Sequence, residues 1–138
     1  KKQERYYYKL VRDVKKTLPL AKEINRAVIE TYEYLQTLPN DKARTRHIKM
    51  VEKGLKEQYT PRMKKLTFAQ GKLLIKLVNR ECNQSSYQLV KAFMGPFKAG
   101  FYQAFAALFG ASLKKEYHPD DEDKMIERIV TLVENGQL

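Results

Sequence analysis

The sequence predicts an all-α protein, a single-domain bundle of six to seven helices around a central apolar helix at about 97–109. Apolar residues recur at helical spacing along most of the 138 residues. No stretch alternates apolar and polar residues as a half-buried strand does. The length fits one domain, and neither a linker nor an internal repeat divides residues 1–138, so we expect a single helical domain.

The segment 97–109 is apolar on nearly every side when it is read as a helix. An aromatic stripe consists of Phe97, Phe101, Phe105 and Leu108. A second stripe of small residues consists of Gly100, Ala104, Ala107 and Ala111. Such a helix is buried among other helices. It is too short to cross a bilayer, which needs about 20 residues.

The first two expected helices meet at Pro19. Residues 4–17 show one apolar face, and a second helix is expected from Thr17 to Leu38. Pro19 predicts an interruption or a kink, because the residue before a proline is pushed away from helical geometry. Thr17 could then serve as the N-cap of the second helix.

The next two helices have recognisable start signals. Asn40 is the expected N-cap of a helix over 41–59, which carries only a narrow apolar stripe and should lie on the outside of the bundle. Thr60-Pro61 is expected to end it. Thr67 and Gln70 have the spacing of a capping box and predict a helix over 67–81.

The remaining elements are a short helix before the central one and a helix at the end of the chain. The short helix is expected from Ser85 to Gly95, and 111–117 fits either a short helix or an extended connector. The last helix follows an acidic run and ends with Gly136 in the C′ position. The expected core consists of Leu73, Leu74, Leu77, Val78, Phe97, Phe101, Phe105, Leu108, Ile126, Ile129 and Val133.

Positive charge is concentrated in two segments. The net charge is +11, and residues 1–16 contribute 7 − 2 = +5 while 41–66 contribute 9 − 3 = +6. Residues 120–134 are acidic, at 2 − 6 = −4. A solvated face is the commoner explanation of such basic runs, although Tyr6, Tyr7 and Tyr8 could stack on nucleic-acid bases. The candidate basic surface consists of Lys9, Arg12, Lys16, Arg46, Lys49, Lys53 and Lys56.

Motifs of known chemistry are absent from the sequence, which predicts no catalytic residue, cofactor or metal site. A Cys82–histidine pair is conceivable, but an inert thiol is the favoured interpretation. The acidic run Asp120–Asp123 beside His118 could hold a cation, yet carboxylates in a first helical turn already complement the helix dipole and cap its amides.

Polar residues also fall within or beside the apolar helices and must satisfy one another if they are buried. The candidate polar cluster consists of Arg80, Glu81, Tyr87, Gln103, Glu116 and Tyr117. We expect Arg80 to pair with Glu116 or with an acid at the start of the last helix. That pair could be a structural lock, or a site if a cleft opens above it.

Several strings resemble an uncharacterised Bacteroidota family that is filed only as a domain of unknown function. They are RYYYKLVRDVKKTLPLAKEIN, LTFAQGKLLIKLVNRE, SSYQLVKAF, FYQAFAALFG and LKKEYHPDDEDKMIERIVTLVENGQL. Gly110-Ala111-Ser112 and Cys82 are positions where we expect members to vary. The resemblance implies an exported protein, with a signal peptide upstream of Lys1, and a periplasmic or envelope location. It supplies no catalytic residues.

These observations favour an interaction or scaffold module that is not an enzyme and is associated with the envelope. Its basic face would meet an acidic polymer, lipid headgroups or a protein partner. The alternative is a nucleic-acid-binding domain that uses residues 1–16 and 41–66. An enzyme of unknown class would need Arg80, Glu81, Tyr87 and Glu116 to converge on one cleft.

Overall fold

The computed structural model describes residues 2–83 and 117–138, and every regular element within them is a helix. These helices are α1 (Lys2–Leu35), α2 (Asp41–Met63), α3 (Phe68–Asn83) and α5 (Lys124–Glu134). The all-α prediction is therefore confirmed. The expected central helix at 97–109 and the short helix before it lie outside the described residues, so the total of six to seven helices stays a prediction.

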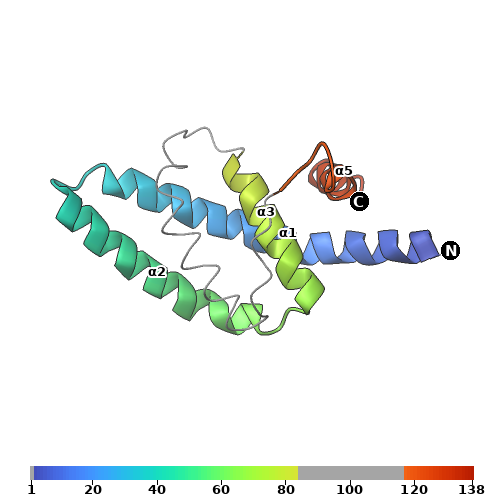
Figure 1. Cartoon of the computed structure of the whole chain (residues 1–138), viewed down its shortest axis with the longest axis horizontal. Coiled ribbons are helices and arrows are strands. Elements are labelled where there is room, and N and C mark those ends of the chain that lie inside the picture. The colour runs from blue at the N-terminus through green and yellow to red at the C-terminus, as the bar shows by residue number, and fades with distance from the viewer. Residues whose placement is uncertain (1, 84–116) are drawn as a thin grey trace.

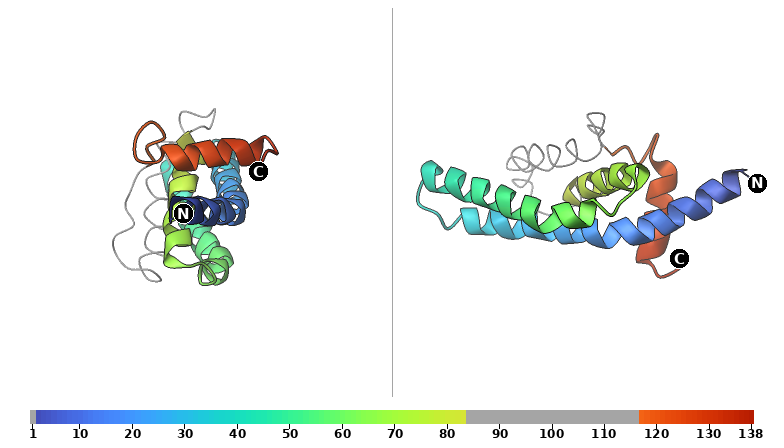
Figure 2. Two further views of the ribbon diagram at one scale, coloured as in Figure 1. Left: turned by 90° about the vertical axis from the view of Figure 1, so that its right-hand side faces the viewer. Right: turned by 90° about the horizontal axis from the view of Figure 1, so that it is seen from below.

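Helix α1 is the element on which the other described helices pack (Figure 1). Helix α2 runs back beside its C-terminal half, α3 packs on its middle, and α5 crosses it nearer the N-terminus (Figure 2). The turn between α1 and α2 places Asn40 at the start of α2, where its side-chain oxygen accepts a hydrogen bond from Ala43 N at 2.9 Å. The predicted N-cap is thus confirmed.

Helix α1 continues through Pro19, so the expected interruption is wrong. A proline inside a helix costs about 3 kcal/mol. Burial on both sides offsets that cost, because Val14, Leu18 and Leu20 all lie in the core, at 0–6% exposure, and each buried side chain of this size stabilises by about 1.5–3 kcal/mol. Thr17 does not cap a helix. Its hydroxyl donates to the Asp13 carbonyl at 2.8 Å.

Helix α2 also passes the proline that was expected to end it. It includes Pro61 and continues to Met63. Tyr59 and Met63 are only 2% and 1% exposed, so the last turn of α2 is held by burial against the core. The rest of α2 presents no fully buried position between Asp41 and Gln58 among its described side chains, in keeping with its expected place on the outside.

The core is centred on α1 and α3. Leu73, Leu74, Leu77 and Ile129 are buried as expected, and Val78, Ile126 and Val133 pack against them while partly exposed. The four expected core residues of 97–109 lie outside the described residues. The expected core omitted buried residues of α1, of the end of α2 and of the turn after it, and one residue each on α3 and α5. These are Val14, Leu18, Leu20, Ala21, Ile24, Tyr59, Met63, Leu66, Ile75 and Val130.

Two further end signals are confirmed. Thr67 Oγ1 accepts from Gln70 N, and Gln70 Oε1 accepts from Thr67 N, both at 3.1 Å, which completes the capping box of α3. At the end of α5, Gly136 has φ +73°. The backbone amides of Gly136 and Gln137 donate to the carbonyls of Val133 and Leu132, the paired bonds of a Schellman motif.

Candidate functional site

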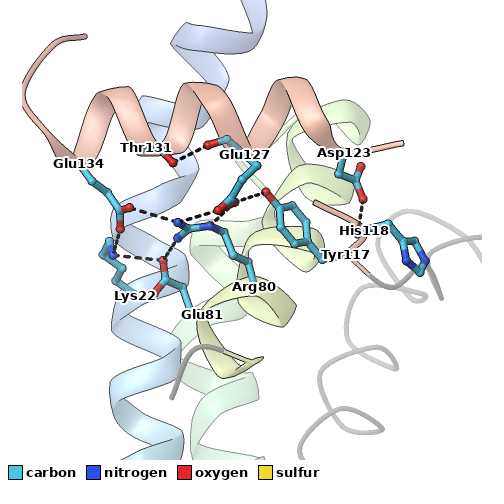
Figure 3. A network of polar contacts seen from close by, with 9 residues as sticks. All are labelled: Lys22, Arg80, Glu81, Tyr117, His118, Asp123, Glu127, Thr131 and Glu134. Atoms are coloured by element: carbon cyan, nitrogen blue, oxygen red, sulfur yellow. Dashed lines mark hydrogen bonds and ion pairs between the residues drawn. The ribbon is translucent and has the colours of Figure 1, made fainter. Parts of the chain in front are cut away.

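The most extensive polar arrangement in the described residues is centred on the guanidinium of Arg80 (Figure 3). Arg80 Nε and Nη2 donate to the two carboxylate oxygens of Glu127 at 2.7 and 3.3 Å, a bidentate pair. Nη2 also reaches Glu134 at 3.2 Å, and Nη1 reaches Glu81 at 2.9 Å. Every guanidinium nitrogen therefore faces a carboxylate, and Arg80 is only 4% exposed.

Helical spacing explains why these groups meet. Glu127 and Glu134 are seven residues apart on α5, two turns of the helix, so they lie on one face. Arg80 lies near the end of α3, where α5 passes. Lys22 links a third helix, α1, to the network, because its Nζ lies 2.7 Å from Glu134 Oε2 and 3.1 Å from Glu81 Oε1. The ion-pair network thus joins α1, α3 and α5.

The tyrosine before α5 completes the network. Tyr117 is 7% exposed, and its hydroxyl donates to Glu127 Oε2 at 2.6 Å. Burial and this hydrogen bond to a carboxylate raise the pKa of Tyr117 well above its usual range. Burial would lower the pKa of Arg80, but the hydrogen bonds and charges of Glu127 and Glu134 outweigh it and raise that pKa. At neutral pH the Arg80 guanidinium therefore stays positively charged and the Tyr117 hydroxyl stays protonated.

The two glutamates on α5 have the opposite balance. Burial alone would raise the pKa of Glu127, but hydrogen bonds from Arg80 and Tyr117 lower it below the usual 4.5. For Glu134, burial is likewise outweighed by Lys22 and Arg80, and its pKa is lowered too. A carboxylate with a lowered folded-state pKa contributes stability that is present above its unfolded value and is lost as pH falls through the folded one.

Acidification is therefore expected to destabilise the fold through Glu127 and Glu134. The free energy of unfolding, measured with urea at a series of pH values, should fall as pH drops below about 4.5. In the double variant Glu127→Gln/Glu134→Gln this contribution is absent, so the stability gap between the native protein and the variant should narrow toward low pH. A gap of constant size from neutral to acidic pH would contradict the assignment.

The structure brings together three of the six residues of the candidate polar cluster. Arg80, Glu81 and Tyr117 belong to the network, whereas Tyr87, Gln103 and Glu116 lie outside the described residues. Glu127, in the first turn of α5, fits the expected class of partner for Arg80. Lys22 and Glu134 also belong to the network but were not among the residues predicted from the sequence. The seven-residue spacing of the glutamates could have indicated Glu134.

The network has the geometry of a structural lock. A ligand anion would need free donors, but each nitrogen of Arg80 already has a carboxylate partner, and the side chain is buried. Breaking such a buried pair leaves uncompensated charge, which is strongly destabilising. The arrangement can therefore fasten α5 to α3 and α1.

The acidic run before α5 differs from its expected role. Helix α5 begins at Lys124, so Asp120, Asp121 and Glu122 lie exposed in the preceding turn. Asp123 occupies the N-cap position, but its side chain makes no hydrogen bond to the amides of α5.

Asp123 instead stabilises the turn and its contact with α3. Its carboxylate is 1% exposed, accepts from His118 N at 2.8 Å and pairs with Lys76 Nζ. Within residues 2–83 and 117–138, no three His, Cys, Asp or Glu side chains are grouped in a way that could hold a metal ion. The His47 ring packs against the Tyr34 ring at 4.5 Å, and the side chain of Cys82 is outside the described set.

The candidate basic surface forms two separate stripes. On α1, the exposed cations recur every three or four residues and lie within about 80° of one another around the helix. The α1 stripe consists of Lys2, Arg5, Lys9, Arg12 and Lys16. On α2, the same spacing gives a second exposed stripe. The α2 stripe consists of Lys42, Arg46, Lys49 and Lys53, and Lys56 would extend it although its side chain is not described.

The two stripes lie at different levels of the molecule. The α2 stripe is beside the C-terminal part of α1, where Tyr34 meets His47. Helical rise puts that level roughly 32 Å along α1 from the middle of Lys9–Lys16. The structure therefore does not combine the predicted residues into one compact surface. Among the described residues, Arg12 is the only member of either stripe with an ion pair, at 3.8 Å to Asp13.

None of the helices in the described part of the chain combines the length and the apolarity that a membrane span requires. The sequence matches no curated protein and no solved structure. A family model described as a domain of unknown function, DUF4294, matches residues 1–132. The match covers all four described helices apart from the last residues of α5. The chain therefore belongs to the DUF4294 family.

Proposed function

We propose that this domain is an interaction or scaffold module of the bacterial envelope, not an enzyme, and that its basic stripes bind an acidic polymer. The observation that carries the proposal is the contrast between two sets of charges. The buried cation Arg80 is fully engaged with carboxylates. The exposed cations of the α2 stripe make no ion pair with the described residues.

The α2 stripe suits a repeating anion better than a single one. Its four cations extend over 12 residues, or roughly 16 Å of helix between the first and the last at about 1.5 Å per residue. A row of like charges with no internal partner raises the local concentration of a polyanion and speeds its association. The stripe is also outside the core, so its charges can be changed without disturbing the fold.

The test compares two triple variants that remove the same charge. Arg46→Gln/Lys49→Gln/Lys53→Gln should lower the salt concentration at which the protein elutes from an acidic polysaccharide column. Lys15→Gln/Lys64→Gln/Lys65→Gln removes three exposed cations that lie off the stripes, and it should have a much smaller effect. Equal effects of the two variants would show that only net charge matters and would overturn the proposal.

Nucleic-acid binding is the second candidate, and one observation favours it. Tyr6 and Tyr8 are 60% and 70% exposed beside the α1 stripe, whereas Tyr7 packs against the core. Exposed aromatic rings beside cations are the groups that stack on single-stranded bases. Tyr6→Ala/Tyr8→Ala should then weaken binding of a single-stranded oligonucleotide more than binding of the polysaccharide. Absent or salt-insensitive oligonucleotide binding would eliminate this candidate.

The envelope location and the Bacteroidota origin are part of the proposal and rest on the resemblance of the sequence strings. Fractionation of the cells that naturally make the protein tests the location. Recovery in the periplasmic or envelope fraction would support it, and recovery in the cytoplasm alone would overturn it. A cytoplasmic result would leave the nucleic-acid candidate in place.

A further inference from the structure

A groove separate from the α2 stripe lies between α1, α3 and α5, with a volume of about 240 Å³. Its apolar lining includes Leu10 of α1, Leu73 of α3 and Ile126 of α5. Lys9 and Lys72 line it as well. From this combination we infer that the groove binds a short-chain amphipathic carboxylate, with the acyl chain on the apolar lining and the carboxylate between the two lysines.

The lining can accept an apolar chain without disturbing the core. Leu73 is 5% exposed and belongs to the core, while Leu10 and Ile126 pack against the core but remain partly exposed to the groove. Ala69 lines the groove as well and is exposed, so its small side chain leaves the space above it open. Covering such apolar surface is favourable in proportion to the area removed from water.

The charges around the groove favour an anionic head group. Two other charged residues in its lining have partners: Lys76 pairs with Asp123, and the buried Asp13 accepts from Gln70 Nε2 at 2.9 Å and lies 3.8 Å from Arg12 Nε. Lys9 and Lys72 have no ion pair among the described residues, although Lys72 Nζ lies over the Phe68 ring, 5.4 Å from its centroid. They therefore leave positive charge in the lining that an anion complements.

The size of the groove limits the ligand. A volume of about 240 Å³ lies below the range of about 300–1,000 Å³ typical of pockets for drug-sized ligands. A short single acyl chain fits this size better than a larger ligand does, and octanoate is the probe.

The experiment is a titration of the isotope-labelled protein followed by amide NMR shifts. Octanoate should give saturable shifts at Leu10, Ala69, Leu73 and Ile126, with at least tenfold higher affinity than acetate or 1-octanol. Acetate lacks the chain and 1-octanol lacks the charge. Equal affinity for octanol and octanoate, or shifts that do not saturate at these residues, would overturn the inference.

Two variants test the two halves of the site. Lys9→Gln/Lys72→Gln should weaken octanoate at least tenfold while leaving octanol unchanged, and Ala69→Phe should fill the groove and abolish binding. Lys15→Gln/Lys64→Gln is the control with the same charge and should bind normally. Undiminished octanoate binding by the first variant would overturn the inference, even if Ala69→Phe fails to fold. The α2 triple variant should also bind normally, so this test and that of the proposed function fail independently.

Discussion

Arg80→Ala is expected to lower the free energy of unfolding by about 3–5 kcal/mol, the range for breaking a buried ion pair from one side. The substitution leaves Glu81, Glu127 and Glu134 facing one another around the space of a buried guanidinium. Since the side chains of Glu127 and Glu134 remain 27% and 31% exposed, water can reach them, and we expect the lower part of that range. Equilibrium unfolding in urea measures the change.

Arg62→Ala is the matched control for this prediction. Arg62 Nη1 also pairs with a glutamate, Glu23, at 2.6 Å, but both side chains are more than 40% exposed. Such surface pairs contribute about 0–1 kcal/mol. Arg80→Lys keeps the charge but loses the planar fork, so its stability should fall between the native protein and Arg80→Ala. If Arg80→Ala and Arg62→Ala cost the same, the network does not fasten α5.

Leu74→Ala is expected to destabilise the protein by about 2–5 kcal/mol. Leu74 is 0% exposed and lies on α3 in the core that α3 shares with α1. Its truncation removes apolar contacts and leaves a cavity that closely packed neighbours fill only in part.

Met50→Ala provides the control for Leu74→Ala, because Met50 is 63% exposed on α2 and should change stability by less than about 0.5 kcal/mol. Thermal and urea unfolding followed by circular dichroism measure both variants. A change below about 1 kcal/mol for Leu74→Ala would mean that α3 does not pack on α1 as described.

Signals that act within one turn of chain were enough to predict three of the helix ends. Asn40, the Thr67–Gln70 pair and Gly136 each satisfy backbone groups only a few residues away, so their roles can be inferred without knowing the fold. The two prolines gave wrong ends for the opposite reason. Their local cost is visible in the sequence, but the burial of Leu18 or Met63 that offsets it depends on distant helices.

The candidate site shows the same division between local and distant information. The sequence indicated that Arg80 leaves an apolar face and needs a carboxylate, and it pointed to the start of the last helix, where Glu127 lies. It could not indicate Lys22, because that contact depends on how α5 crosses α1. The spacing within each basic stripe is readable from the sequence, but the distance between the stripes follows from the reversal of the chain after α1.

The packing of every other described helix on α1 has a consequence for synthesis on the ribosome. Helix α1 is made before the other described helices, yet the bond from Lys22 to Glu134 joins residues 112 positions apart. At about 5–20 residues per second, Glu134 is synthesised roughly 6–20 s after Lys22. During that interval part of the apolar face of α1 is uncovered, so the helix that is made before the other described helices reaches its final surroundings among the last.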